Sequence, residues 1–413
     1  MNYKFPLIEH VDQIRAAIAG RDEFIIADRD THLIANYLVA YEDTFPEIFD
    51  HDSEQERELK ALRREARGLI FCAKTGEVIS RPFHKFFNLN ERTDTSYNRV
   101  DISRPHLILD KLDGSFIRPY QTHDGVFRIG TKMGETEVAQ HAHGFFDREN
   151  YRDFAEYCFG QGITPIFEML TRKQRIVLDY GKTDRLVLLA MRYNFTGNYF
   201  SYAEMVDWAR QYDIDVVSEF GSADDLEALA DQVSQQEDVE GYILRFDNGH
   251  SLKIKTQWYV GLHRVKESLN QEKNVVRLVM EDSVDDAKGF MFADDAKIIE
   301  RFQMDMHRGI NQTVSGLEDK FEQAMSILDS EDYSMFERPD AERKKRFALD
   351  HASQFDGLHK QFMFRMYDGY DCGTEVRNAI MKKLGNQASV DQIRPLIGGI
   401  RWFDYYSSSD LDN

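Results

Sequence analysis

The segment Lys111-Leu112-Asp113-Gly114-Ser115 has the residues of a nucleophile held before a tight turn. Apolar runs precede it at 107–109 and follow it at 116–120, so we expect the lysine at the end of a strand. A neutral amine can attack a phosphorus atom and form a phosphoramidate. A free lysine is almost entirely protonated at pH 7, so nearby cations or a metal ion must favour the neutral form. Alone, the pattern also fits a β-hairpin turn with an exposed lysine.

A second group of charges lies downstream. Glu240 precedes the apolar run 242–244, and Lys253 and Lys255 lie two residues apart on the next predicted strand. Side chains two apart on a strand point to the same face, so the two ammonium groups repel each other unless they meet an anion. The ordinary alternative is a solvated strand face.

Further charged residues lie on both sides of the turn. Arg67 and Lys85 supply cations upstream, and Glu168 lies within an apolar run. A carboxylate in such a run is costly to bury without a hydrogen-bond partner. Together these residues could form one site, in which a lysine attacks, cations hold a triphosphate, and carboxylates bind a ribose or a metal ion.

The order of these residues resembles that of the covalent nucleotidyltransferases, which include DNA ligases, RNA ligases and mRNA capping enzymes. Four segments are similar to the tRNA-repair RNA ligases of T-even bacteriophages: RPFHKFFNLNE at 81–91, FEM at 167–169, VEGYIL at 239–244 and KIKTQWYV at 253–260. The segment MYDGYD at 366–371 extends the resemblance into the C-terminal third.

The resemblance implies an ATP-dependent RNA ligase in which Lys111 is the adenylated nucleophile. It implies that Glu168 binds the ribose hydroxyls and that Glu240 acts at a metal-linked step. The ATP phosphates would be contacted by Arg67, Lys85, Lys253 and Lys255. Two further positions matter in the family and are carried over as nucleotide contacts, Tyr37 and Lys132. Asp285 and Asp286 resemble a cation-binding segment, although a solvated helix face is the more common place for such a pair.

The implied reaction has three steps. Lys111 takes AMP from ATP, AMP passes to an RNA 5′-phosphate, and a 3′-hydroxyl then displaces AMP and seals the strand. Magnesium is expected, with manganese as the alternative, because a divalent cation stabilises charge in phosphoryl transfer. The expected partners are ATP and single-stranded RNA ends, with a nicked tRNA anticodon loop as the candidate in tRNA repair. No obligate protein partner is evident.

The pattern of elements predicts an α+β fold in two domains. Short strands and turn dipeptides between 67 and 260 indicate antiparallel sheets, and the resemblance implies that these sheets flank an ATP cleft. We expect an adenylyltransferase domain at 1–261, with an N-terminal subregion at 1–66 in which 53–65 forms an exposed, charged helix. Apolar residues at helical spacing predict an all-helical domain at 262–413, with a break near Gly309 and Gly316. Every motif named for adenylation lies before this domain, so we expect it to provide the surface that selects the RNA substrate.

Composition sets further limits. The chain has 413 residues and a net charge of −20, which argues against non-specific nucleic-acid binding unless the cations cluster in one cleft. No apolar run approaches the roughly 20 residues that span a bilayer, and the N-terminus lacks a signal-peptide pattern. The 3 cysteines form no CxxC pair, so we expect reduced core thiols. The expected location is the cytoplasm, or the host cytoplasm if the protein is phage-encoded.

Two other functions compete with RNA ligation. DNA ligases and GTP-dependent capping enzymes normally append an OB-fold after the Lys253-type motif, whereas this chain continues into predicted helices. An RNA-binding module with a degenerate nucleotide site would be expected to lack Lys111 or the Lys253–Lys255 pair. All three lysines are present.

Overall fold

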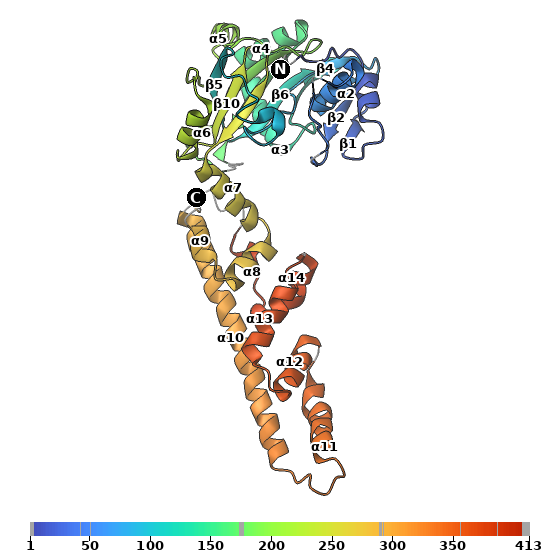
Figure 1. The fold of residues 1–413 in the computed structure, drawn as a ribbon, viewed down its shortest axis with the longest axis vertical. Coiled ribbons are helices and arrows are strands. Elements are labelled where there is room, and N and C mark those ends of the chain that lie inside the picture. The colour runs from blue at the N-terminus through green and yellow to red at the C-terminus, as the bar shows by residue number, and fades with distance from the viewer. Residues whose placement is uncertain are drawn as a thin grey trace. The chain divides into compact units, whose positions relative to one another are not determined.

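The computed structural model describes residues 4–406, except 42, 50, 173–176, 289, 290, 292, 356 and 386. Contacts between residues divide the chain into two compact units, Met1–Val260 and Gly261–Asn413. The first unit contains every strand of the described residues, and the second is built from helices (Figure 1). The expectation of an α+β fold with antiparallel sheets and a helical C-terminal region is confirmed.

Three antiparallel sheets form the first unit. One sheet has the order β1-β2-β3-β4, with strands Phe24–Asp28, His32–Tyr37, Arg67–Cys72 and Val78–Ser80. A second has the order β11-β10-β5, with strands Ser251–Lys255, Gly241–Phe246 and His106–Asp110. The third has the order β7-β6-β8-β9, with strands Phe127–Gly130, Ser115–Gln121, Ile163–Leu170 and Arg185–Tyr193.

Six α-helices of the first unit cover these sheets: α1 Val11–Ile18, α2 Glu54–Glu65, α3 Glu137–Phe146, α4 Glu149–Gly160, α5 Tyr202–Gln211 and α6 Leu226–Ser234. Helix α4 packs on β8, where Phe154 of the helix and Phe167 of the strand are both fully buried. This contact ties the helix layer to the sheet that carries Glu168, and β8 is buried along almost its whole length.

Helix α2 is less exposed than its sequence predicts. Its N-terminus has the expected capping box, in which Ser53 and Glu56 exchange hydrogen bonds. The last turn, however, buries Ala61, Leu62, Arg64 and Glu65. The prediction of a fully exposed helix is therefore wrong for its C-terminal turn, because two buried arginines from distant parts of the chain, Arg81 and Arg192, pair with Glu65.

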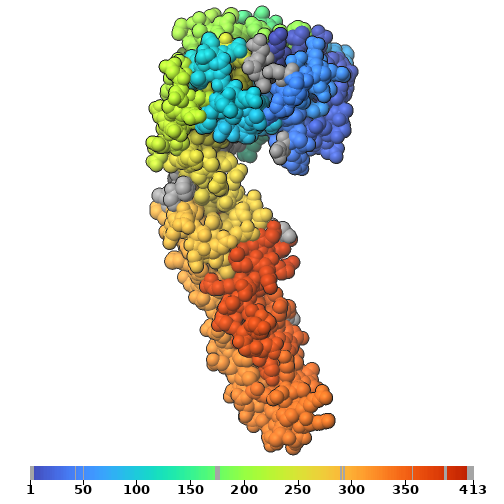
Figure 2. Space-filling model, in the orientation of Figure 1, coloured from blue at the N-terminus to red at the C-terminus, as the bar shows by residue number. Residues whose placement is uncertain are grey.

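The second unit contains most of α7 Gln257–Leu269, followed by α8 Glu272–Met280, α9 Val284–Lys288, α10 Ala293–Asp329, α11 Pro339–Arg346, α12 Gly357–Tyr367, α13 Cys372–Lys382 and α14 Gln387–Ile393. Buried residues of α10 such as Phe302 and Met306 pack with α12, α13 and Trp402 in one core. The C-terminal segment, in red, lies along this long helix in the space-filling view (Figure 2). None of the described helices is long and apolar enough to cross a membrane.

The predicted break near Gly309 and Gly316 is absent, since α10 runs unbroken through both glycines. A Cβ atom at Gly309 would lie 2.4 Å from the carbonyl carbon of Ile397. Gly309 therefore permits close approach of the 394–397 turn to the helix, which periodicity alone does not distinguish from a break. All three cysteines are buried and free, as expected.

Candidate active site

Lys111 lies where the chain crosses from one sheet to another. It directly follows β5, and its backbone N–H donates to the Gly241 carbonyl oxygen at 3.0 Å. Four residues later β6 begins, and it pairs with β8 of a different sheet. The Asp113-Gly114 turn is thus not a hairpin turn, and it fixes Lys111 between two sheets.

Asp113 is buried and holds this crossing in place. Its Oδ2 accepts from the backbone N–H groups of Val177 and Leu178, each at 2.7 Å, and its Oδ1 accepts from the Tyr259 hydroxyl at 2.6 Å. A Cβ atom at Gly114 would lie 2.4 Å from the Met169 carbonyl oxygen. The sequence indicated the turn, but these partners lie more than sixty residues away and had no local signal.

Glu240 joins two of the predicted lysines. Its Oε1 lies 2.5 Å from the Lys111 Nζ and 3.0 Å from the Lys255 Nζ, and the side chain is 4% exposed. Gly241 follows with φ +141°, and a Cβ atom there would lie 2.0 Å from the Ile254 carbonyl oxygen. The glycine lets β10 and β11 approach closely, which sets the carboxylate between the two ammonium groups.

Lys253 lies two residues before Lys255 on β11, on the same face of the sheet. The register pairs Gly241 with Lys255 and Ile243 with Lys253, so both lysines face the same side. Among the described residues Lys253 makes no ion pair, and its Nζ lies 4.9 Å from the centre of the Phe86 ring. Burial, and then the charges of Arg67, Lys85, Lys111 and Lys255, lower the pKa of Lys253 to about 7.

A second group of cations surrounds the ring of Tyr37. It consists of Arg67, Lys85 and Lys132. The Lys132 Nζ lies 3.8 Å from the centre of the Tyr37 ring, and the Lys85 Nζ lies 5.5 Å from it. Burial would raise the pKa of Tyr37, but the positive charges of Arg67, Lys85 and Lys132 outweigh it and lower the pKa. Burial, together with the charge of Arg67, lowers the pKa of Lys132.

Glu168 lies on β8 opposite Phe116, and both residues line a cavity that Lys111, Lys253 and Lys255 also line. Loss of hydration raises the pKa of Glu168 to about 8 against the opposing charge of Lys111, and Glu240 adds to the rise. The sequence indicated that burying this carboxylate would be costly. Its raised pKa reflects that cost, because burial favours the protonated form near neutral pH.

A cavity of about 290 Å³ brings together five of the predicted site residues, whereas its lining does not include Tyr37, Lys85, Lys132 or Glu240. Its charged side chains are Arg67, Asp110, Lys111, Glu168, Arg245, Lys253 and Lys255, and its apolar wall includes Phe83, Phe86, Leu109, Leu189, Val217 and Ile243. Five cations and an apolar wall match a ligand with several negative charges and a flat, weakly polar group. Despite the overall charge of −20, cationic side chains outnumber carboxylates in the lining of this cavity.

The carboxylates suit a hard divalent cation. Glu168 and Glu240 supply oxygen donors beside the cation cluster, and magnesium commonly binds through one or two carboxylates plus substrate phosphates. Within the described ranges no three His, Cys, Asp or Glu side chains gather as a preformed metal cluster. Asp285 and Asp286 lie in α9 of the second unit, where Asp285 pairs with Lys288 at 2.7 Å. Their metal-binding role stays a prediction.

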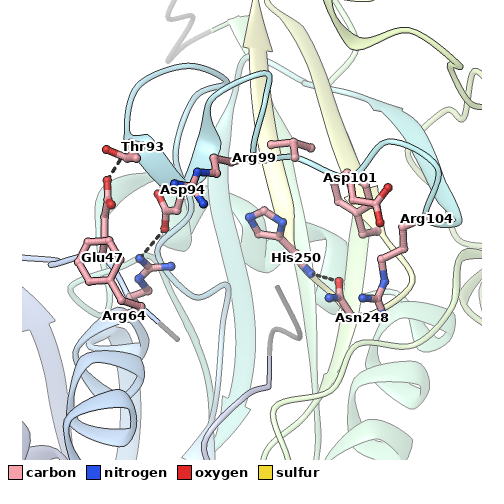
Figure 3. Close-up of a pocket in the computed structure, with 12 residues that line it drawn as sticks. Glu47, Arg64, Thr93, Asp94, Arg99, Asp101, Arg104, Asn248 and His250 are labelled. Atoms are coloured by element: carbon pink, nitrogen blue, oxygen red, sulfur yellow. Dashed lines mark hydrogen bonds and ion pairs between the residues drawn. The ribbon is translucent and has the colours of Figure 1, made fainter. Parts of the chain in front are cut away.

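A second cavity, of about 190 Å³, lies elsewhere in the first unit (Figure 3). Three arginines line it, but Arg64 pairs with Asp94 at 3.0 Å and Arg104 pairs with Asp247 at 2.5 Å. Burial, and then the charge of Arg64, lower the pKa of His250 to about 4, so this imidazole is neutral at pH 7. Because carboxylates already pair with two of its three arginines, this cavity is poorly suited to a polyphosphate.

Comparison with known proteins bears on the same region. Residues 65–259 match the RNA ligase family. The matched segment includes Arg67, Lys85, Lys111, Lys132, Glu168, Glu240, Lys253 and Lys255, whereas Tyr37, Asp285 and Asp286 lie outside it.

Curated relatives carry the same description. The chain is 29% identical over 235 residues to a putative RNA ligase of Thermovibrio ammonificans, covering 54% of this chain and 57% of that protein. It is 25% identical over 295 residues to RNA ligase 1 of bacteriophage TS2126, covering 67% and 68% of the two chains. The chain thus spans little more than half the length of the first relative.

Solved structures resemble the fold more distantly. A putative ATP-dependent DNA ligase from Aquifex aeolicus has a TM-score of 0.43 at 13% identity, covering 65% of this chain and 67% of that one. An archaeal ATP-dependent RNA ligase has a TM-score of 0.42 at 14% identity, covering 62% and 65%.

The pKa of Lys253 predicts how nucleotide affinity depends on pH. Above pH 7 the free protein holds Lys253 mainly neutral, whereas a bound phosphate favours the ammonium form. ATP binding should therefore take up a proton near pH 8, and affinity should fall by up to about tenfold per pH unit above pH 7. Calorimetry in two buffers of different ionisation enthalpy measures the uptake.

Glu168 also titrates in this range, so Lys253→Met provides the control. The variant should lose the proton uptake while the titration of Glu168 remains. Equal ATP affinity at pH 7 and pH 9 in the unmodified protein would contradict the prediction.

Proposed function

We propose that the protein is an ATP-dependent RNA ligase that joins RNA 5′-phosphate and 3′-hydroxyl ends through a lysyl-AMP intermediate. The observation that carries the proposal is the contact of the Lys111 Nζ with the Glu240 Oε1 at 2.5 Å, beside a cavity rich in cations. The RNA ligase match over residues 65–259 supports the same reaction class. A role in RNA or tRNA repair is the biological setting we propose.

The geometry provides the groups for adenylation. Lys111 attacks the α-phosphorus of ATP, the bond to the bridging oxygen breaks, and pyrophosphate leaves. Glu240 is placed to accept the proton that the Lys111 amine loses. Lys253 and Lys255 offset negative charge that develops on the α-phosphate and on the leaving group. A bound magnesium ion, held by Glu240 and phosphate oxygens, would supply additional charge neutralisation.

The next two steps use the same site. The RNA 5′-phosphate attacks the lysyl-AMP phosphorus and releases Lys111, which gives an A(5′)pp(5′)RNA end. The 3′-hydroxyl of the second RNA end then displaces AMP and forms the phosphodiester bond. The apolar wall suits the adenine ring, and Glu168 is placed on the cavity wall to bind ribose hydroxyls.

Incubation with labelled ATP or GTP followed by denaturing electrophoresis tests the proposal. Covalent AMP on the protein, followed by sealing of a 5′-phosphorylated RNA, is the expected result. Covalent GMP would indicate a capping enzyme, and sealing of nicked DNA alone would indicate a DNA ligase. The absence of any label would indicate an RNA-binding module.

Loss of Lys253 or Lys255 should affect adenylation most. Removing one phosphate contact in a desolvated site should lower the rate by about 10²–10³, or roughly 2–4 kcal/mol in the barrier. Arginine should restore only part of the activity, because its planar group is larger and its geometry is fixed. AMP transfer by Lys253→Ala and Lys255→Ala is the measurement, with Lys182→Ala, from a loop outside the cavity lining, as the control. Rates equal to those of the unmodified protein would mean that the pair is only a solvated strand face.

We further propose that residues 262–413 select the RNA substrate. A chain ending after α7 retains every residue proposed for adenylation and should still form lysyl-AMP. Compared with the full chain, it should lose efficiency in sealing a nicked anticodon stem-loop. Its sealing of an unstructured oligonucleotide should be less affected. Undiminished sealing of the stem-loop by a soluble, folded truncated protein would refute the selection role.

A further inference from the structure

Arg118 is the most deeply buried cation near the candidate site. It lies on β6, two residues after Phe116, and its side chain is fully buried. Strand alternation places Arg118 on the same face as Phe116, which lines the cavity. The centre of its guanidinium group lies 5.6 Å from the Phe116 ring and 5.9 Å from the Tyr120 ring.

The guanidinium group has no acceptor within the described part of the chain. Its Nε, Nη1 and Nη2 atoms are all buried, and none has a hydrogen-bond partner there. No carboxylate there lies within ion-pair distance of Arg118 either. This contrasts with Arg81 and Arg192, which are equally buried and share the carboxylate of Glu65. A buried charge without a counter-charge is costly, so its retention calls for a partner outside the protein.

The surroundings of Arg118 are also positive. A Cβ atom at Gly68 would lie 3.0 Å from the Arg118 Nη1 and 2.6 Å from the Lys132 carbonyl oxygen, so Arg118 lies directly behind the Arg67–Gly68 and Lys132 backbone. The Nη1 of Arg67 is likewise buried without a partner in the described residues. Burial, with the charge of Arg67, lowers the pKa of Arg118 to about 10, so the group stays charged at pH 7.

We infer that Arg118 is a positioning residue for a polyphosphate: its buried charge, behind Arg67 and Lys132, is balanced by the pyrophosphate portion of the bound nucleoside triphosphate. The choice of ligand rests on the proposed function, whereas the anion site itself rests on the Arg118 guanidinium group and the Arg67 Nη1, which have no hydrogen-bond partner among the described residues. A pyrophosphate group carries several negative charges and could balance Arg67, Lys132 and Arg118 together. The interior attenuates charge less than water does, so Arg118 acts on the ligand without touching it.

This role separates the steps of ligation. Only ATP-dependent adenylation involves the pyrophosphate portion, whereas sealing of pre-adenylated RNA does not. Arg118→Met in the full-length protein should raise the KM for ATP and the Kd for pyrophosphate about 10- to 100-fold. Its sealing of pre-adenylated RNA should stay within about twofold of the unmodified protein. Because the substitution removes an unpaired charge, the melting temperature without ligand should not fall.

Two further variants sharpen the test. Arg118→Lys keeps the charge and should restore most of the pyrophosphate binding. Arg185→Met removes a charge from an exposed position on β9 and should change none of these values. Pyrophosphate alone is the probe, measured by calorimetry and by the rise in melting temperature that it causes.

Several outcomes would overturn the inference. One is pyrophosphate binding by Arg118→Met equal to that of the unmodified protein. A second is an equal loss of adenylation and of sealing of pre-adenylated RNA by Arg118→Met. A third is failure of Arg118→Met to fold. Either of these two results would show that Arg118 has a structural role instead. If the unmodified protein forms no covalent nucleotide, the proposed function fails, but the pyrophosphate comparison still decides whether Arg118 serves an anion site.

Discussion

Lys111→Ala should abolish covalent AMP formation and sealing with ATP, a loss of roughly 10⁴-fold or more, because no other group can form the phosphoramidate. The amine of Lys111 lies 2.5 Å from the Glu240 Oε1 at the junction of two sheets. Lys253 and Lys255 lie on β11, which β10 separates from β5 in the same sheet, and we assign them to the phosphates and not to attack. Gel detection of labelled protein measures the loss.

A second variant helps to separate chemistry from folding. Lys111→Arg keeps the positive charge but should also be inactive, because arginine stays protonated and cannot attack. Both variants should keep the melting temperature within a few degrees, since Lys111 is partly exposed and Asp113 holds the turn. Measurable AMP transfer by Lys111→Ala would show that Lys111 is not the nucleophile.

Glu65→Ala should destabilise the first unit by about 3–5 kcal/mol, because two buried guanidinium groups would lose their shared carboxylate. The Glu65 Oε1 lies 2.9 Å from the Arg81 Nη2 and 2.7 Å from the Arg192 Nη2, and its Oε2 accepts from the Arg192 Nη1 at 2.8 Å. All three side chains are at most 1% exposed. Thermal unfolding followed by circular dichroism measures the change.

The same cluster gives a pH dependence. Burial would raise the pKa of Glu65, but Arg192 and Arg81 outweigh it and lower the pKa to about 2. The unfolded-state pKa of a glutamate is about 4.3, so the stabilisation is complete above that pH and is lost as pH falls toward 2. In Glu65→Ala this part of the acid dependence should disappear.

The consequences should extend to the candidate site. Glu65 lies two residues before Arg67, and Arg81 lies four residues before Lys85, so the cluster anchors two segments that carry cations. Glu65→Ala should therefore lower AMP transfer as well as stability. Glu58→Ala, on the exposed face of α2, is the matched control and should change stability by less than about 0.5 kcal/mol. Unfolding of Glu65→Ala at the temperature of the unmodified protein would contradict the structural role.

Local pattern was enough to predict most elements. The apolar runs at 107–109, 116–120 and 242–244 lie within β5, β6 and β10. The helical character of the C-terminal third also follows from its spacing of apolar residues. These features depend on the spacing of apolar and polar residues within one element, so they can be predicted from the local sequence alone.

Partnerships between distant residues depend on how the sheets are stacked. The sequence indicated that Lys253 and Lys255 share a strand face, but only the fold shows Lys255 paired with Glu240 and Lys253 without a carboxylate partner among the described residues. The roles of these site residues stay predictions for the experiments above. The residues meet because β5 and β11 flank β10, which local periodicity does not specify.

Buried charge was the least predictable property. The sequence of α2 reads as an exposed charged helix, yet Glu65 is enclosed by arginines from segments beginning at 81 and 185. Arg118 had no sequence signal at all, because an arginine on a strand is normally solvated. A side chain's environment is set by every element packed around it. The sequence by itself therefore determined the elements and the nucleophile candidate, whereas tertiary packing decided which charges are paired, which are buried, and which are left for a ligand.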